Sequence, residues 1–172
     1  MKKSDIKLIV FPIVTVLMLG TIWFFVLTQD KPKTAISYEK VWSILESNGY
    51  TPADLTKAYQ EKWSLGDALQ KAVNYETDEL QFNFFAFDRA ETAENISKQY
   101  QTYIKEKGFE DKNTLVSKKA SDYSLYTAKA NGTYTINMRV SDTVVFAYCK
   151  EENEDLLNQI MRNIGYFNED NK

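Results

Sequence analysis

The stretch YSLYTAKANGTYTINMRV, residues 123–140, decides the fold class of this chain. Asn131 and Gly132 stand at its centre, and this dipeptide favours the positive φ angles of a two-residue type I′ turn. Apolar and polar residues alternate after the turn, which is the pattern of a β-strand with one buried and one wet face. The sequence therefore predicts an antiparallel hairpin with strands at 123–130 and 133–140.

More strands are expected on both sides of this hairpin. A turn at Ser141 leads into a third strand at 143–149, and a short strand is predicted near 115–118. Earlier in the chain, residues 68–75 and 80–87 are predicted to be paired strands, with a helix as the alternative for the first of them. One face of the 80–87 strand is predicted to be core and consists of Leu80, Phe82, Phe84 and Ala86.

Apolar residues spaced three and four positions apart predict three amphipathic helices. They are expected at residues 38–47, 89–107 and 151–163, and the apolar face of the second includes Tyr100 and Tyr103. Asp88 is predicted to cap the second helix together with Glu91, as a variant of the capping box. Residues 55–75 fit either a helix or a strand, and Pro52 before them is typical of the first turn of a short helix.

These elements predict an α+β domain: an antiparallel sheet of four or five strands with about three helices packed mostly on one face. The domain is assigned to residues 37–167, a length that can bury one hydrophobic core. Residues 29–36 are expected to form a short stalk before it, and the polar residues 168–172 a disordered tail after it.

Residues 8–28, LIVFPIVTVLMLGTIWFFVLT, carry no charge. A helix of that length reaches roughly 31 Å, close to the ~30 Å hydrocarbon core of a bilayer. Because no small-residue cleavage site follows, the segment is predicted to be an N-terminal transmembrane signal anchor with the lipid bilayer as its partner. The basic tail, residues 1–7, is expected in the cytoplasm and the domain outside it, although lysines flank the segment almost equally on both sides.

The composition argues against several kinds of chemistry. The 172 residues include no histidine and one cysteine, which removes the usual general base near neutral pH, the Ser-His-Asp triad and the commonest metal ligand. The chain after the apolar segment carries 18 basic and 23 acidic side chains, a net charge of −5, which argues against a nucleic-acid partner. We therefore expect no cofactor, no metal site and no catalytic residue, and interpret the chain as non-enzymatic.

Acidic residues in or beside predicted turns are weak candidates for acid–base catalysis. They are Asp54, Asp67, Glu76, Asp78 and Glu79. A catalytic pair needs two carboxylates held at a fixed separation in a cleft, and acidic turns are common in domains without one. Cys149 ends an apolar strand, where a buried and unreactive thiol is expected.

Aromatic residues are frequent, with eleven tyrosines and ten phenylalanines. Most of them fit the core of a sheet, since aromatic side chains favour strands. The alternative is a binding surface for a sugar or a peptide. Its candidate residues are Trp63, in a predicted polar loop, and Phe85 and Phe87 if their face of the sheet is uncovered.

The order of elements resembles a known group of proteins. The resemblance depends on a Ser-led helix ending in Gly-Tyr, an aromatic strand followed by Asp and an Ala-rich helix, an aromatic hairpin, and a last helix ending in Gly-Tyr. The residues concerned are Ser37, Gly49-Tyr50, Leu80-Gln81-Phe82-Asn83-Phe84, Asp88 and Ile164-Gly165-Tyr166. The pattern is similar to that of uncharacterised small membrane-anchored or exported envelope proteins of Gram-positive, clostridia-like bacteria. The resemblance implies a place in the bacterial envelope and no particular activity.

The sequence thus favours a binding or interaction module: a single-pass anchor that presents a small α+β domain outside the cytoplasm to an envelope component or a membrane protein partner. An accessory subunit of a larger membrane complex is the alternative, and a carboxylate-dependent extracytoplasmic hydrolase is the least favoured one. An aromatic patch with a concave pocket would support the first hypothesis, and two carboxylates meeting in a deep cleft would support the last.

Overall fold

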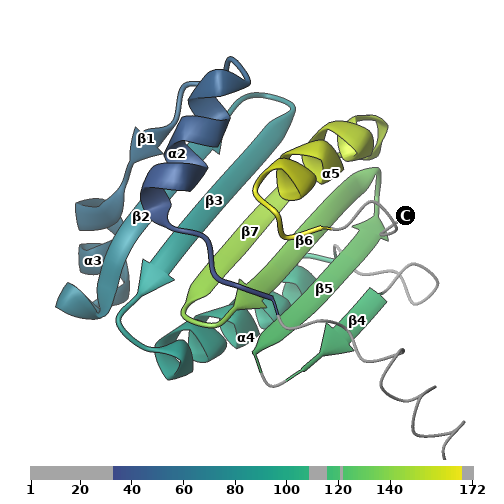
Figure 1. Cartoon of the computed structure of the whole chain (residues 1–172). Coiled ribbons are helices and arrows are strands. Elements are labelled where there is room, and N and C mark those ends of the chain that lie inside the picture. Colours follow the sequence, from purple (N-terminus) through teal and green to yellow (C-terminus); the bar gives the residue numbers. More distant parts are fainter. Residues whose placement is uncertain (1–32, 109–115, 121, 168–172) are drawn as a thin grey trace, which may run out of the picture. The chain divides into compact units, whose positions relative to one another are not determined.

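The computed structural model describes residues 33–108, 116–120 and 122–167. In these residues one antiparallel sheet of seven strands, in the order β1-β2-β3-β7-β6-β5-β4, packs with four α-helices (Figure 1). The strands are β1 (Ala53–Asp54), β2 (Leu69–Glu76), β3 (Leu80–Phe87), β4 (Val116–Lys119), β5 (Tyr123–Ala130), β6 (Thr133–Val140) and β7 (Thr143–Lys150). The helices are α2 (Tyr38–Ser47), α3 (Thr56–Trp63), α4 (Ala90–Glu106) and α5 (Glu154–Asn163), with 3-10 turns η1 (Gly66–Ala68) and η2 (Glu151–Asn153).

The hairpin predicted around Asn131 and Gly132 is confirmed. Both residues have positive φ angles, 53° and 74°, as a type I′ turn requires. β5 and β6 pair in register from the turn to their far ends, where Tyr123 lies opposite Val140. The two strands begin and end at the predicted residues, because the turn alone specifies their register.

The sheet consists of two halves that are joined where β3 pairs with β7. β1, β2 and β3 form the first half, and α4 then carries the chain across the sheet to β4 at its other edge. The meander from β4 to β7 brings the chain back, so that Asn83 of β3 lies opposite Phe146 of β7. Residues far apart in the sequence therefore become neighbours in the middle of the sheet.

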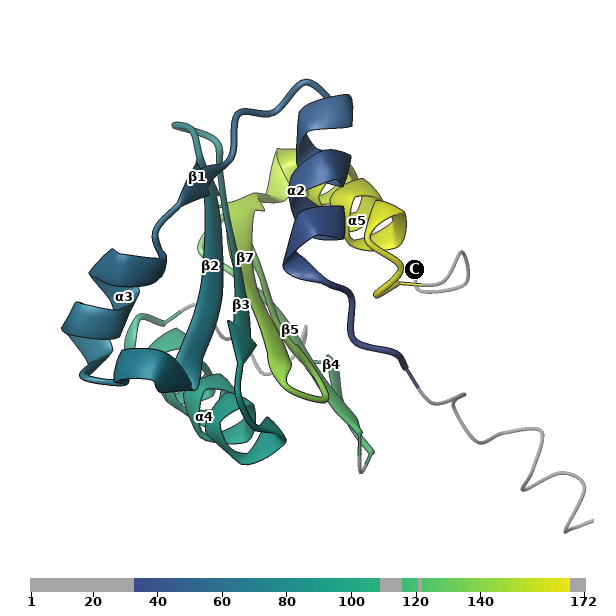
Figure 2. The same ribbon diagram turned by 60° about the vertical axis from the view of Figure 1, so that its left-hand side comes forward.

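Helices cover both faces of the sheet, and not mostly one face as predicted. Figure 2 shows α2 and α5 on one side of the strands and α3 and α4 on the other. The second face of β6 was expected to be wet, yet Thr135, Asn137 and Arg139 are buried there beneath α4. The prediction is wrong because α4 packs over this face. Asn137 Nδ2 donates to the Ser97 carbonyl of α4 at 2.8 Å and Arg139 Nη1 to the Ser141 carbonyl at 3.1 Å, whereas the buried Thr135 hydroxyl has no hydrogen-bond partner among the described residues.

The main core lies on the α2–α5 side of the sheet. The predicted core face of β3 is confirmed, since Phe82 and Phe84 have no exposed surface and Leu80 is buried. They pack with Met138 of β6 and with helix residues such as Leu157 of α5. Apolar side chains close this face in the part of the chain that the structure describes, and a cleft lies on the other face.

Two local predictions need correction, and one open alternative is resolved. Ala53–Asp54 is a short strand paired with β2 and not a helical turn. The residues 55–75, which fit either a helix or a strand, form α3, η1 and most of β2. The cap of α4 is Arg89, with no side-chain hydrogen bond to the helix, in place of the predicted Asp88. The Asp88 carboxylate instead accepts hydrogen bonds from Arg89 Nε and Thr92 Oγ1, which are nearer to it.

The predicted fold class is wrong in the number of strands and in the placement of the helices. The transmembrane helix that was part of this prediction is not found in the described part of the chain. No helix in the ranges given above is long and apolar enough to cross a membrane. Residues 1–32, which contain the segment predicted to be a single-pass signal anchor at 8–28, lie outside the described residues, and so does the predicted tail at 168–172. The structure supports an α+β domain with seven strands.

Candidate functional site

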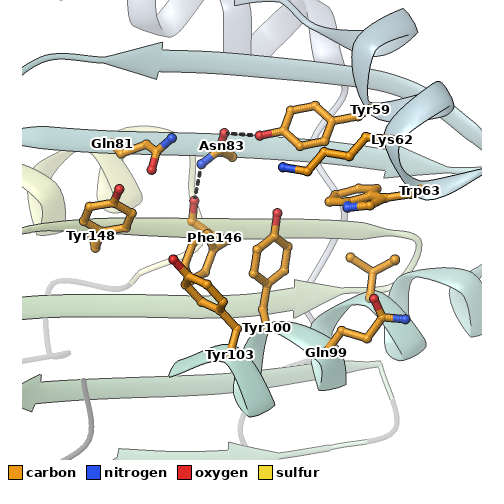
Figure 3. Close-up of a pocket in the computed structure, with 11 residues that line it drawn as sticks. Tyr59, Lys62, Trp63, Gln81, Asn83, Gln99, Tyr100, Tyr103, Phe146 and Tyr148 are labelled. Carbon is orange, nitrogen blue, oxygen red and sulfur yellow. Dashed lines mark hydrogen bonds between the residues drawn. The ribbon is translucent and has the colours of Figure 1, made fainter. Parts of the chain in front are cut away.

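An open cleft of about 430 Å³ lies on the second face of the sheet, between α3 and α4 (Figure 3). We call it the aromatic cleft, because six of the side chains that line it are aromatic. Helix α3 contributes Tyr59, Lys62 and Trp63, helix α4 contributes Ile96, Gln99, Tyr100 and Tyr103, and the sheet contributes Gln81, Asn83, Phe146 and Tyr148.

The pleat of the sheet brings the floor of the cleft together. Side chains of β3 alternate between the two faces, so Gln81 and Asn83 point away from the main core. The antiparallel register places Gln81 opposite Tyr148 and Asn83 opposite Phe146. The floor therefore consists of two amide side chains beside two aromatic ones.

A hydrogen-bond network holds the amide group of Asn83, which is only 2% exposed. Its Oδ1 accepts from the Tyr59 hydroxyl at 3.2 Å and from Asn74 Nδ2 at 3.0 Å. Its Nδ2 donates to the Phe146 carbonyl at 3.2 Å. This network ties α3 to the sheet and orients the ring of Tyr59 at the edge of the cleft.

Ring contacts connect the two helical walls. Tyr100 of α4 stacks on Phe146, with 4.1 Å between centroids and 12° between planes. Phe85 lies beneath the cleft with no exposed surface, and its centroid is 5.0 Å from that of Tyr59 and 4.9 Å from that of Trp63. The walls and the floor of the cleft are thus packed against one another.

The three candidate residues from the sequence occupy different positions. Trp63 was expected in a polar loop, but it is the last residue of helix α3. Its side chain lines the cleft. Phe85 lies under the cleft, and Phe87 packs in the apolar cluster with Leu69 and Val144 outside the lining. Their face of the sheet is covered by α3 and α4, so Phe85 and Phe87 present no open surface.

Most residues of the lining are not predicted from the sequence. Tyr100 and Tyr103 repeat at a helical spacing on α4, and this signal was assigned to core packing. Asn83 alternates with Phe82 and Phe84 on β3, which places an amide on the face opposite the core. The sequence left open whether the residues of α3 form a helix. Without that helix the cleft has no wall opposite α4.

Lys62 is the cation of this lining. Its Nζ lies 5.6 Å from the centroid of the Tyr59 ring, and it has no ion pair with another described residue. None of the lining residues named above is a carboxylate or a cysteine.

Burial raises the pKa of the phenols of Tyr59, Tyr100 and Tyr148, and that of Tyr100 by a large amount. At neutral pH these hydroxyls therefore keep their protons.

The acidic residues considered for catalysis do not meet in a cleft. Asp54 Oδ1 accepts from the backbone nitrogen of Thr56 at 2.9 Å, in the turn that leads into α3. The other four, Asp67, Glu76, Asp78 and Glu79, are exposed. In the described ranges no group of three or more His, Cys, Asp or Glu side chains is placed to hold a metal ion.

Cys149 is buried, as expected, and we predict that its thiol is unreactive in the native protein. Burial raises the pKa of this thiol to about 12, from an ordinary value of 9.0. We expect a disulfide reagent such as DTNB to modify the native chain at pH 8 much more slowly than the chain unfolded in guanidinium. Rapid modification of the native chain would contradict the burial.

The same pKa shift predicts a pH dependence of stability. Between pH 9 and pH 12 the unfolded chain loses the thiol proton while the native chain keeps it, so the Cys149 contribution lowers the free energy of unfolding as the pH rises. The limiting slope is about 1.4 kcal/mol per pH unit. Guanidinium unfolding of the wild type and of Cys149→Ala at pH 8 and pH 10.5 measures it, because only the wild type has this contribution.

Known proteins that are similar to this chain do not indicate its function. The chain matches no protein-family model and no curated protein. Among solved structures it is similar to the crystal structure of a GTP binding regulator from Thermotoga maritima, with 16% sequence identity and a TM-score of 0.45. The match covers 77% of this chain and 90% of that chain. A likeness this distant carries no argument about ligand or activity, and the resemblance to envelope proteins of Gram-positive bacteria stays a prediction.

Proposed function

We propose that the domain is a ligand-binding module and that the aromatic cleft is its binding site. The observation that carries the proposal is the cleft itself. Its volume of about 430 Å³ falls within the roughly 300–1,000 Å³ of small-molecule sites, and its lining of aromatic side chains with a few polar groups is typical of them. Aromatic rings supply contact area, and the amides and hydroxyls orient the ligand.

The hydrogen bonds of Asn83 support the same proposal. A side chain that is already held in place loses little conformational freedom when a ligand binds, which favours affinity. Asn83 fixes the floor of the cleft and, through Tyr59, one of its walls. The stacking of Tyr100 on Phe146 restrains the opposite wall in the same way.

The lining favours binding over reaction. Half-buried tyrosines whose pKa is raised are hydrogen-bond donors at neutral pH and not general bases. Lys62 is exposed, whereas a catalytic lysine is usually buried. The location of the domain outside the cytoplasm and the accessory-subunit alternative stay predictions, because they depend on residues 1–32.

Tryptophan fluorescence offers a direct test. The full-length chain would be titrated with a panel of monosaccharides, disaccharides, aromatic acids and their amides, and short peptides. Trp63 lines the cleft, whereas Trp42 lies on α2 beside Tyr38, on the other side of the sheet. A ligand in the cleft is expected to raise the melting temperature and to change the fluorescence of the wild type.

Two matched variants locate the bound ligand. The fluorescence change is expected to persist in Trp42→Phe and to disappear in Trp63→Phe, since both substitutions keep an aromatic ring and each removes one indole. If no compound of the panel raises the melting temperature, or if the signal disappears in Trp42→Phe instead, the proposal is wrong.

A further inference from the structure

The aromatic cleft offers hydrogen-bond donors that have no acceptor in the described part of the chain. The Lys62 ammonium, the Tyr100 hydroxyl and the Trp63 indole N–H make no hydrogen bond to another described residue. The floor differs, since both polar atoms of the Asn83 amide are already bonded. A ligand that satisfies these three side chains must bring acceptor oxygens to them.

Lys62 and Tyr100 face the same space from opposite walls. Figure 3 shows the Nζ of Lys62 turned inward from α3, above Trp63, and the Tyr100 hydroxyl directed from α4 toward the same region near Asn83. One group is a cation and the other a neutral donor, a combination that suits an anionic oxygen. No carboxylate among the lining residues competes for either of them.

The shape of the remaining lining favours a ring. Trp63 and Tyr59 lie with 4.7 Å between centroids on the α3 wall, and Tyr103, which is 38% exposed, stands at the rim on the α4 wall. Side chains of this kind bind flat or puckered rings through their faces and edges. An extended aliphatic anion would leave most of these contacts unused.

We propose that the aromatic cleft takes a six-membered ring bearing one carboxylate, which Lys62 Nζ and the Tyr100 hydroxyl hold while the ring lies against the aromatic walls. The inference rests on the proposed function, because it names the ligand class of the same cleft. Two sources share this chemistry: a uronic acid, in which the ring is a sugar, and an aryl carboxylic acid, in which it is aromatic.

The test compares each acid with its neutral amide. Glucuronic acid and glucuronamide form one pair, and 4-hydroxybenzoate and 4-hydroxybenzamide form the other, each titrated by calorimetry into the full-length chain. The acid of at least one pair is expected to bind about tenfold or more tightly than its amide, as for hydrogen bonds to charged groups. The pair that shows this preference identifies the source of the ring.

Three variants assign the effect to residues. Lys62→Met is expected to weaken binding of the acid about tenfold or more and to weaken binding of the amide much less, because the amide carbonyl accepts from the ammonium but carries no charge. Tyr100→Phe keeps the ring that stacks on Phe146 and removes only the hydroxyl, so a loss of about 2- to 10-fold for the acid is expected. Lys57→Met is the matched control, because Lys57 is an exposed lysine of the same helix outside the lining.

The outcomes separate this inference from the proposed function. If amides bind in the cleft as tightly as acids, or if Lys57→Met weakens the acid as much as Lys62→Met does, the carboxylate site is wrong while the binding module stands. If none of the four compounds binds but another compound of the wider panel gives the Trp63 signal, the ligand class is wrong alone. If nothing in the panel binds, both proposals are wrong.

Discussion

Phe85→Ala is expected to lower the free energy of unfolding by about 3–5 kcal/mol, which is the usual cost of truncating a buried phenylalanine. The ring has no exposed surface and lies between β3, Tyr59 and Trp63. Removing it leaves a cavity beneath the aromatic cleft that neither α3 nor the sheet can fill without moving. Guanidinium unfolding of the full-length chain at pH 7 measures the change.

Phe85→Leu is the control for this prediction. Leucine keeps much of the buried volume, so a loss of less than about 1.5 kcal/mol is expected. A loss that small for Phe85→Ala as well would show that α3 is not tightly packed on the sheet. The predicted difference between the two variants therefore tests the packing of the cleft floor directly.

Asn83→Leu is expected to lower the free energy of unfolding by about 2–4 kcal/mol, although leucine has nearly the same size. The substitution leaves the Asn74 amide and the Tyr59 hydroxyl without the acceptor that Asn83 Oδ1 provides. A buried polar group left unsatisfied costs about 1–3 kcal/mol. Loss of α3 anchoring is also expected to weaken any ligand that binds in the cleft.

A double-mutant cycle with Tyr59→Phe isolates one bond of this network. Tyr59→Phe alone is expected to cost about 1 kcal/mol, and it should cost little when Asn83→Leu is already present. The resulting coupling energy of about 1 kcal/mol measures the hydrogen bond between the two side chains. Additive costs would mean that this bond does not stabilise the native state.

Local sequence patterns predicted the strands better than they predicted which faces of the sheet the helices cover. The turn dipeptide Asn131-Gly132 specifies the β5–β6 hairpin without help from the rest of the chain. The helices α3 and α4 on the second face of the sheet were not predicted. An alternating pattern of polar residues indicates a solvent-exposed face only when those side chains have no partners within the protein. Ser97 and Asn137, forty residues apart, satisfy each other, and no local pattern shows that pairing.

Only part of the candidate site was predicted, for a similar reason. Trp63 was singled out as a large aromatic residue in polar surroundings, and it does line the cleft. The helix that carries it was ambiguous because none of its residues is fully buried and its cap, Leu55, makes no side-chain hydrogen bond. Tyr100 was assigned to packing because a helical repeat does not show which of its members faces a cavity.

The pairing of β3 with β7 has a consequence for the way the domain folds and opens. Each half of the sheet can form from contacts between neighbours in the chain, whereas this junction closes a long loop and is slow for entropic reasons. Asn83 and Phe146, which lie opposite each other across the junction, both contribute to the cleft floor. If a ligand binds in the cleft as proposed, it contacts both halves of the sheet, and we expect it to oppose their separation.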